Sequence, residues 1–384
     1  MARSPATGPA AVLALQRSLG NRAVRRVLQR APTGIKEAKP TTDYTNDALA
    51  YWRDPANQSK GLGEYAIVLA MRANATLTGI GVPQMKPVID TNAYYHGAFD
   101  WTDWKIRMNI ARWSKTLGAK ATTLSDLTME EAAGAAGAIY HEARHAEQHF
   151  RMARMLAGES KSTKIEDKAD EIQKALGFKD RNVAIAAAGA PLAKSAANAD
   201  LLTEAHDWEA ITHGFHVPYR NVVNGWVNET LALQDTIRAM EQQPMKVSSF
   251  EPTITATIDG WRKGATRAKF LASHLKSTNK KKAKTPGDAV VITHLKAIQA
   301  EMDNVVKEWK RIKGTWAKDG PNTRLQNIIG FKPTLYALYN ALQEAYEAQA
   351  HEADAFETGN AVIAQFKVGA PAKPPAKVPA GATP

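Results

Sequence analysis

The stretch that decides the architecture is residues 128–145, TMEEAAGAAGAIYHEARH. It opens with a capping box, in which the Thr128 hydroxyl and the Glu131 carboxylate satisfy free N–H groups at a helix start. The sequence therefore predicts a long helix from about Met129 to Leu156. Small residues allow another element to approach this helix closely: Gly134, Gly137 and Ala138.

The helix carries the motif H-E-x-x-H at residues 141–145. His141 and His145 are four residues apart, so both imidazoles lie on one helical face and can reach a single ion. Glu142 projects about 100° around the helix from His141, beside the metal rather than on it. There its carboxylate can take a proton from a zinc-activated water. The alternative is coincidence, because a chain of this length meets the pattern by chance about one time in a hundred.

A third ligand must come from elsewhere in the chain. The sequence has no cysteine, so any metal is held by His, Asp or Glu. His149 is one helical turn too far to share the ion, which favours a supporting or surface role. The residue three beyond His145 is Gln148, so the longer motif with a further histidine is absent.

Two regions offer that ligand. The preferred one is Glu352, because Ala355 and Phe356 behind it would let its helix press against the H-E-x-x-H helix. The alternative for Glu352 is a solvated helix face. The second region spans residues 204–216, and its single histidines are typical of capping or surface positions: His206, His213 and His216.

The region before the motif predicts strands. Residues 87–113 are rich in β-branched and aromatic side chains, and residues 104–110 alternate apolar with polar. We therefore expect a small antiparallel sheet that precedes the long helix.

The rest of the chain is mostly helical in pattern. Helices are expected over residues 164–176, 201–212, 222–243, 288–312 and 333–366, with a loop or short helix over 184–199. The fold class is α+β and mainly α, with a helical C-terminal lobe. Three parts are expected: an amphipathic helix and linker over 1–40, the main domain over 41–366, and a disordered Pro/Ala/Lys tail over 367–384.

Charge and hydropathy exclude some classes of function. The formal net charge is +12, but the basic residues gather in flanks and loops, and no nucleic-acid motif accompanies them. Nucleic acid is therefore an unlikely partner. No run approaches the roughly 18 apolar residues of a membrane span, and the N-terminus is a poor secretory signal.

The layout of motif helix and distant glutamate resembles the gluzincin branch of zinc metallopeptidases. The resemblance rests on His141, Glu142, His145 and Glu352, and it implies a zincin-like fold with a catalytic Zn²⁺. Gluzincins often carry an aspartate four residues after the third ligand. Here that position is Phe356, and Asp354 stands at plus two, which leaves the supporting carboxylate open.

Residues 15–24, LQRSLGNRAV, resemble a leader on proteins associated with bacterial extracellular contractile injection systems. The resemblance implies a cargo toxin, made in the bacterial cytoplasm without a secretory signal and loaded into the injection particle through this helix. The alternative is an ordinary amphipathic helix that packs on the domain.

These resemblances together imply a zinc endopeptidase-like effector acting on a protein or peptide substrate. We expect an extended substrate to add to the strand near residues 105–111. The transition-state donor is open among Tyr339, Tyr346, His216 and His351. The alternative function is a non-catalytic accessory or structural protein of the particle that retains the metal-site fold. A pore-forming or DNA-acting toxin, which only the basic patches suggest, ranks last.

Overall fold

The computed structural model describes residues 34–90, 96–113, 122–214, 216–242, 247–278 and 286–369. The predicted leader helix and most of the predicted tail lie outside these residues. The chain divides into two compact units, Met1–Glu209 with Asp354–Pro384, and Ala210–Ala353. The last helix begins at the end of the second unit and continues into the first.

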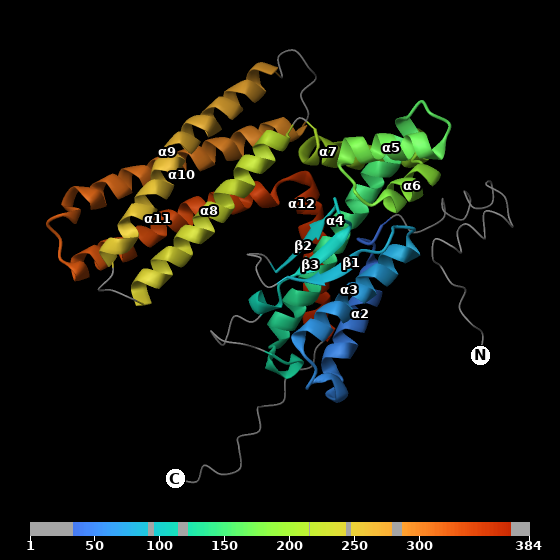
Figure 1. Ribbon diagram of the computed structural model, residues 1–384, viewed down its shortest axis with the longest axis horizontal. Helices are drawn as coiled ribbons and strands as arrows, with labels where there is room; N and C mark the ends of the chain where they lie inside the picture. Colours follow the sequence, from blue (N-terminus) through green and yellow to red (C-terminus); the bar gives the residue numbers. More distant parts are fainter. Residues whose placement is uncertain are drawn as a thin grey trace, which may run out of the picture. The chain divides into compact units, whose positions relative to one another are not determined.

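The first unit is built around the predicted long helix, α4 (Met129–Glu159) (Figure 1). The expected capping box is present at its start, where Thr128 Oγ1 accepts from Glu131 N at 3.2 Å. The other helices of this unit are α2 (Ala38–Arg53), α3 (Leu62–Gly79), α5 (Ile165–Leu176), α6 (Arg181–Gly189), α7 (Ala199–Thr212) and α12 (Ala350–Gly369).

The linker expected to reach Pro40 ends earlier. Ile35 is fully buried, and α2 already begins at Ala38. The backbone N–H of Ile35 donates to Glu147 at 3.0 Å and its carbonyl accepts from Tyr140 at 2.8 Å, so this segment belongs to the first unit. The Pro, Thr and Gly residues of this segment suggested a linker. Composition carries no information on hydrogen-bond partners more than 100 residues away, so the burial of Ile35 could not be predicted.

The sheet is mixed rather than antiparallel. Its order is β1 (Lys86–Ile89), β3 (Lys105–Met108), β2 (Gly97–Asp100). β3 pairs antiparallel with β2, as expected, but parallel with β1. β3 is therefore central and cannot be the edge that accepts a substrate strand; of the described strands, β2 and β1 form the edges. Alternating apolar and polar side chains predict a strand, but they do not predict which strands pair with it or in which direction. The expectation of a purely antiparallel sheet is therefore wrong.

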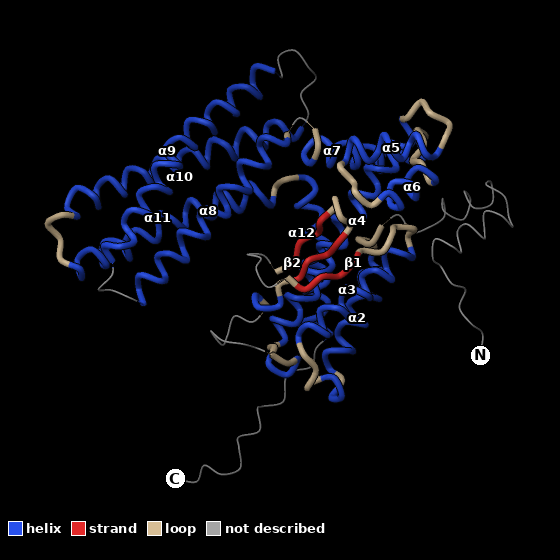
Figure 2. The backbone as a smooth tube through the Cα atoms, in the orientation of Figure 1, coloured by secondary structure: helices blue, strands red, loops and turns tan. Residues whose placement is uncertain are grey.

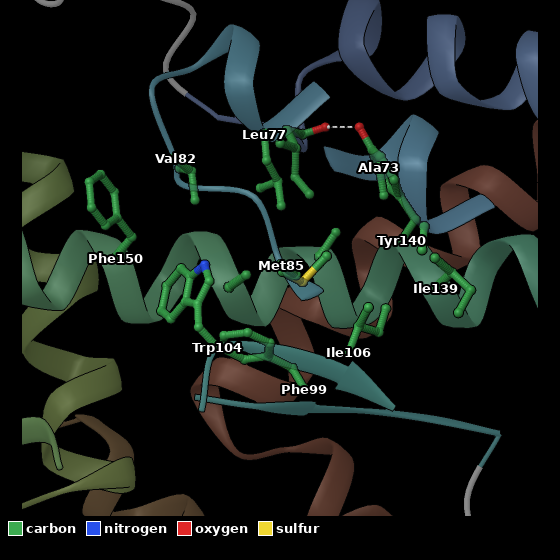
Figure 3. Close-up of a cluster of buried hydrophobic side chains, with 14 of the residues drawn as sticks. Ala73, Leu77, Val82, Met85, Phe99, Trp104, Ile106, Ile139, Tyr140 and Phe150 are labelled. Atoms are coloured by element: carbon green, nitrogen blue, oxygen red, sulfur yellow. Dashed lines mark hydrogen bonds between the residues drawn. The ribbon is translucent and has the colours of Figure 1, made fainter. Parts of the chain in front are cut away.

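The sheet packs on α4 through an apolar layer (Figure 3). The predicted alternation along β3 is confirmed, since Ile106 and Met108 are fully buried while Lys105 and Arg107 are partly exposed. Trp104 precedes this strand, and its ring meets Phe99 edge-on at 5.0 Å. This layer fixes β2 and β3 against the face of α4 that carries the motif.

Glycine lets α4 and α12 approach each other closely. A Cβ on Gly359 of α12 would lie 2.8 Å from the Gly137 carbonyl oxygen and 3.1 Å from His141 Cβ. A Cβ on Gly137 would meet Ile363 and Gly359 at 2.5 and 2.9 Å. By contrast, a Cβ on Gly134 would meet nothing within 4 Å. The predicted close approach is therefore confirmed at Gly137 and not at Gly134.

This difference gives a matched test on one helix. Gly137→Ala is expected to lower the free energy of unfolding by about 1–3 kcal/mol, because the new methyl group overpacks the contact with α12. Gly134→Ala adds the same methyl group in open space and should raise stability by up to about 1 kcal/mol through helix propensity. Urea unfolding of both variants measures the contrast; equal stabilisation of the two would show that the helices do not meet here.

The second unit is a bundle of long helices, labelled α8 to α11 in Figure 2. They are α8 (Val217–Gln242), α9 (Val247–Thr278), α10 (Pro286–Trp316) and α11 (Pro321–Glu347). Their apolar faces meet around fully buried side chains such as Trp261, Met302 and Phe331. This confirms the predominance of helix.

Two helical features of the C-terminal half differ from expectation. α9 was not predicted, because Pro252 and the many Thr residues of this segment obscure a helix that tertiary packing stabilises. The single helix predicted over 333–366 is two helices, α11 and α12, and Pro333 lies inside α11. None of the described helices has both the length and the apolarity needed to cross a membrane.

Candidate metal centre

The two motif histidines lie together in the middle of α4. His141 and His145 are each 8% exposed, and their Nε2 atoms are 3.0 Å apart. The rings meet edge-on with centroids 4.7 Å apart. Helical spacing of four residues brings both nitrogens to one point, as the sequence predicted.

Glu352, in the first turn of α12, completes the group. Its carboxylate and the two imidazoles offer three ligand atoms that all lie within 4.8 Å of one another, and all three residues are buried. Among the described residues, no other group of three or more His, Asp or Glu side chains could hold a metal ion. The structure thus brings Glu352 to the two motif histidines, although it lies more than 200 residues further along the sequence.

The donor chemistry fits a divalent transition metal. Tetrahedral coordination with metal–nitrogen distances of about 2.0–2.1 Å places neighbouring ligand nitrogens about 3.3 Å apart. The observed 3.0 Å between the two Nε2 atoms is close to this spacing. Two imidazoles and one carboxylate are three of the four ligands that tetrahedral zinc takes.

Glu142 lies beside the three ligands and not among them. Its Oε1 is 3.8 Å from His141 Nε2, and its Oε2 accepts the backbone N–H of Phe99 at 2.7 Å. A Cβ on Gly97 would stand 3.3 Å from Glu142 Cγ, so β2 passes close to this carboxylate. The sequence predicted the position of Glu142 but not the strand that fixes its orientation.

Phe356 and Ala355 have the packing role expected of them. The Phe356 ring meets His141 edge-on with centroids 4.6 Å apart, and Ala355 is fully buried. Phe356 stands where gluzincins often carry an aspartate. Here that position makes an apolar contact with the proposed ligand His141.

A buried ion network lies behind the motif. The Arg144 side chain is fully buried, pairs with Glu147 at 2.5 Å, and donates from Nε to Asp354 at 2.7 Å. Arg151 pairs with the other oxygen of Glu147 and reaches Glu204 at 2.7 Å. These contacts link α4 to α7 and α12.

The network lowers the pKa of two of its carboxylates, Glu147 and Asp354. Burial alone would raise the pKa of Glu147, but the Arg144 and Arg151 guanidinium groups outweigh it and hold the pKa below its usual value. Burial likewise opposes a low pKa at Asp354, and again Arg144 prevails, helped by hydrogen bonds from Arg144 and Gln148. The motif histidines thus stand next to fixed charges, which the sequence did not indicate.

The remaining candidate histidines have other environments. His149 is 4% exposed, stacks on Trp101 at 5.2 Å, and contacts the His145 carbonyl through Nδ1 at 2.9 Å, so it is not a surface residue. His206 is half exposed and lies 3.3 Å from Glu159.

The second unit holds the rest of these histidines. The pKa of His213 is lowered to about 4, chiefly by burial and then by the charges of Arg220 and His351. His216 is buried, and His351 Nε2 lies 3.3 Å from Glu352 Oε1. His213 and His216 do not join the ligand group.

Comparison with known proteins identifies no relative: no family model matches the chain, and no curated protein or solved structure is significantly similar to it. Any functional conclusion therefore depends on the chemistry of this site.

Proposed function

We propose that this protein is a zinc-dependent metallopeptidase. The observation that carries the proposal is the convergence of His141, His145 and Glu352 with an intact Glu142 beside them. A purely structural metal site needs no such base. The zincin-like fold implied by the motif belongs to the same proposal.

Zn²⁺ in this site would polarise a peptide carbonyl and lower the pKa of water to near neutrality. Glu142 has the position of the general base. Its Oε2 accepts the Phe99 N–H, which orients the carboxylate and leaves Oε1 on the side of His141. Glu142 would take a proton from the attacking water and pass it to the leaving amine.

An extended peptide is the expected substrate, and β2 is the strand that it would join. β2 is an edge of the described sheet, and it passes the proposed base at Phe99. Main-chain hydrogen bonds to an edge strand hold a peptide in extended form with little dependence on its sequence. The expected pairing with β3 is wrong, because β3 is the central strand.

The leader-like residues 15–24 extend the proposal to delivery. A peptidase carrying such a segment would act as a cargo effector of a contractile injection system, made in the bacterial cytoplasm and loaded through its N-terminal helix. Co-purification of the full chain with injection particles, compared with a chain lacking residues 1–33, tests this part independently of catalysis.

The metal is tested first, by elemental analysis of purified full-length protein. We expect about one zinc per chain, and no zinc in the double variant His141→Ala, His145→Ala. His206→Ala is the matched control, because this histidine pairs with Glu159 outside the ligand group. Absence of zinc from the wild-type chain, even after incubation with zinc salts, would refute the proposal.

A further inference from the structure

His145 is held by a side chain that is neither a ligand nor the base. Its Nδ1 lies 2.8 Å from Oε1 of Gln148, three residues along α4. Gln148 is completely buried. On the opposite side, Gln148 Nε2 donates to Asp354 Oδ2 at 2.8 Å. The amide thus bridges a proposed ligand on α4 and a carboxylate on α12.

Asp354 determines which way this amide points. An ionised carboxylate only accepts hydrogen bonds, so it must face the NH₂ group of Gln148. The carbonyl oxygen of Gln148 is then turned to His145, and Nδ1 must carry the ring proton. The remaining nitrogen, Nε2, keeps its lone pair on the side of His141, where a metal would bind.

The carboxylate itself is firmly placed. Arg144 donates to it from Nε at 2.7 Å and from Nη2 at 3.1 Å, and Lys36 reaches Oδ1 at 3.2 Å. Arg144 is fully buried and the Asp354 side chain is 13% exposed, so most of the pair is shielded from solvent. Asp354 stands two residues after Glu352, and it therefore also fixes the start of the helix that carries the third ligand.

We propose that Gln148 and Asp354 are positioning residues of the metal site: they set the tautomer of His145 and hold α12 in the register that presents Glu352. The inference rests on the metal site proposed above. It accounts for Phe356 at the place where the gluzincin pattern has an aspartate. The supporting carboxylate is instead Asp354, two residues after Glu352, and it acts on His145 through the Gln148 amide of α4.

The test measures zinc affinity of the full chain by competition with a chromophoric chelator. Gln148→Leu is expected to weaken zinc binding about 10- to 100-fold, the usual effect of losing a hydrogen-bond partner of a ligand. Glu204→Gln is the matched control, because Glu204 belongs to the same ion network through Arg151 but does not touch Gln148. Its zinc affinity should stay within about twofold of wild type.

Gln148→Glu separates positioning from a general packing role. It keeps an acceptor oxygen toward His145 Nδ1 but loses the donor to Asp354. Its zinc affinity should exceed that of Gln148→Leu, and the visible spectrum of its Co²⁺-substituted form should stay closer to wild type. The melting temperatures of the metal-free chains should not follow the same order, because this variant places two carboxylates side by side.

The possible outcomes are distinct. If wild type binds zinc and Gln148→Leu binds it within about twofold, the positioning role is refuted while the metal site stands. If Gln148→Glu binds zinc no better than Gln148→Leu, the tautomer argument is refuted. If wild type binds no zinc, this inference and the proposed function both fall.

Discussion

Glu142→Gln is expected to lower kcat/KM for peptide hydrolysis by about 10²- to 10⁴-fold, the range that a positioned general base contributes. The substitution removes the charge and the basicity but keeps the shape of the side chain. Its amide oxygen can still accept the Phe99 N–H, which in the native protein lies 2.7 Å from the carboxylate. Zinc content should therefore remain near one per chain. Hydrolysis of a quenched peptide library, with elemental analysis of the same samples, measures both.

Glu130→Gln provides the control for this experiment. It makes the same chemical change on the same helix, at an exposed position in the first turn of α4. We expect it to retain full activity. Undiminished hydrolysis by zinc-loaded Glu142→Gln would exclude Glu142 as the base. A zinc-loaded wild-type chain that cleaves no peptide would favour the non-catalytic accessory protein.

The features that the sequence predicted correctly have local causes. The helix over α4 follows from the capping box at Thr128 and Glu131, and both partners lie within four residues. The meeting of His141 and His145 follows from helical periodicity alone. The choice of Glu352 went further, since small and aromatic residues behind it indicated a helix that packs closely. Gly359 and Phe356 show that contact.

The features that the sequence did not predict depend on distant partners. β3 lies between β1 and β2. The alternation of apolar and polar residues predicts each strand but fits several possible strand orders, so this order could not be predicted. The role of Gln148 could not be predicted from the sequence. A glutamine that bridges two helices cannot be distinguished by its residue type from any other polar residue of a helix. The burial of Ile35 is hidden for the same reason, since its partners Tyr140 and Glu147 lie over 100 residues away.

Glu147→Ala is the substitution expected to destabilise the first unit most. Glu147 is 3% exposed and accepts the Ile35 N–H at 3.0 Å while it pairs with Arg144 and Arg151. Its removal takes one of two carboxylate partners from each guanidinium group, and Arg144 is fully buried. Breaking one side of a buried ion pair costs about 3–5 kcal/mol. Chemical unfolding of the full chain, followed by hydrogen exchange of the backbone amides of α4, measures the loss.

The cause of that loss can be separated from simple truncation. Glu171→Ala, at an exposed position on α5, removes the same atoms from a helix and should change stability by less than about 0.5 kcal/mol. Glu147→Gln keeps an acceptor for Ile35 but not the charge. If charge dominates, Glu147→Gln should lose nearly as much as Glu147→Ala; if the Ile35 hydrogen bond dominates, it should lose little. We expect the former, because Glu147 pairs with two guanidinium groups but accepts a single backbone N–H. A loss below about 1 kcal/mol in Glu147→Ala would contradict the buried network itself.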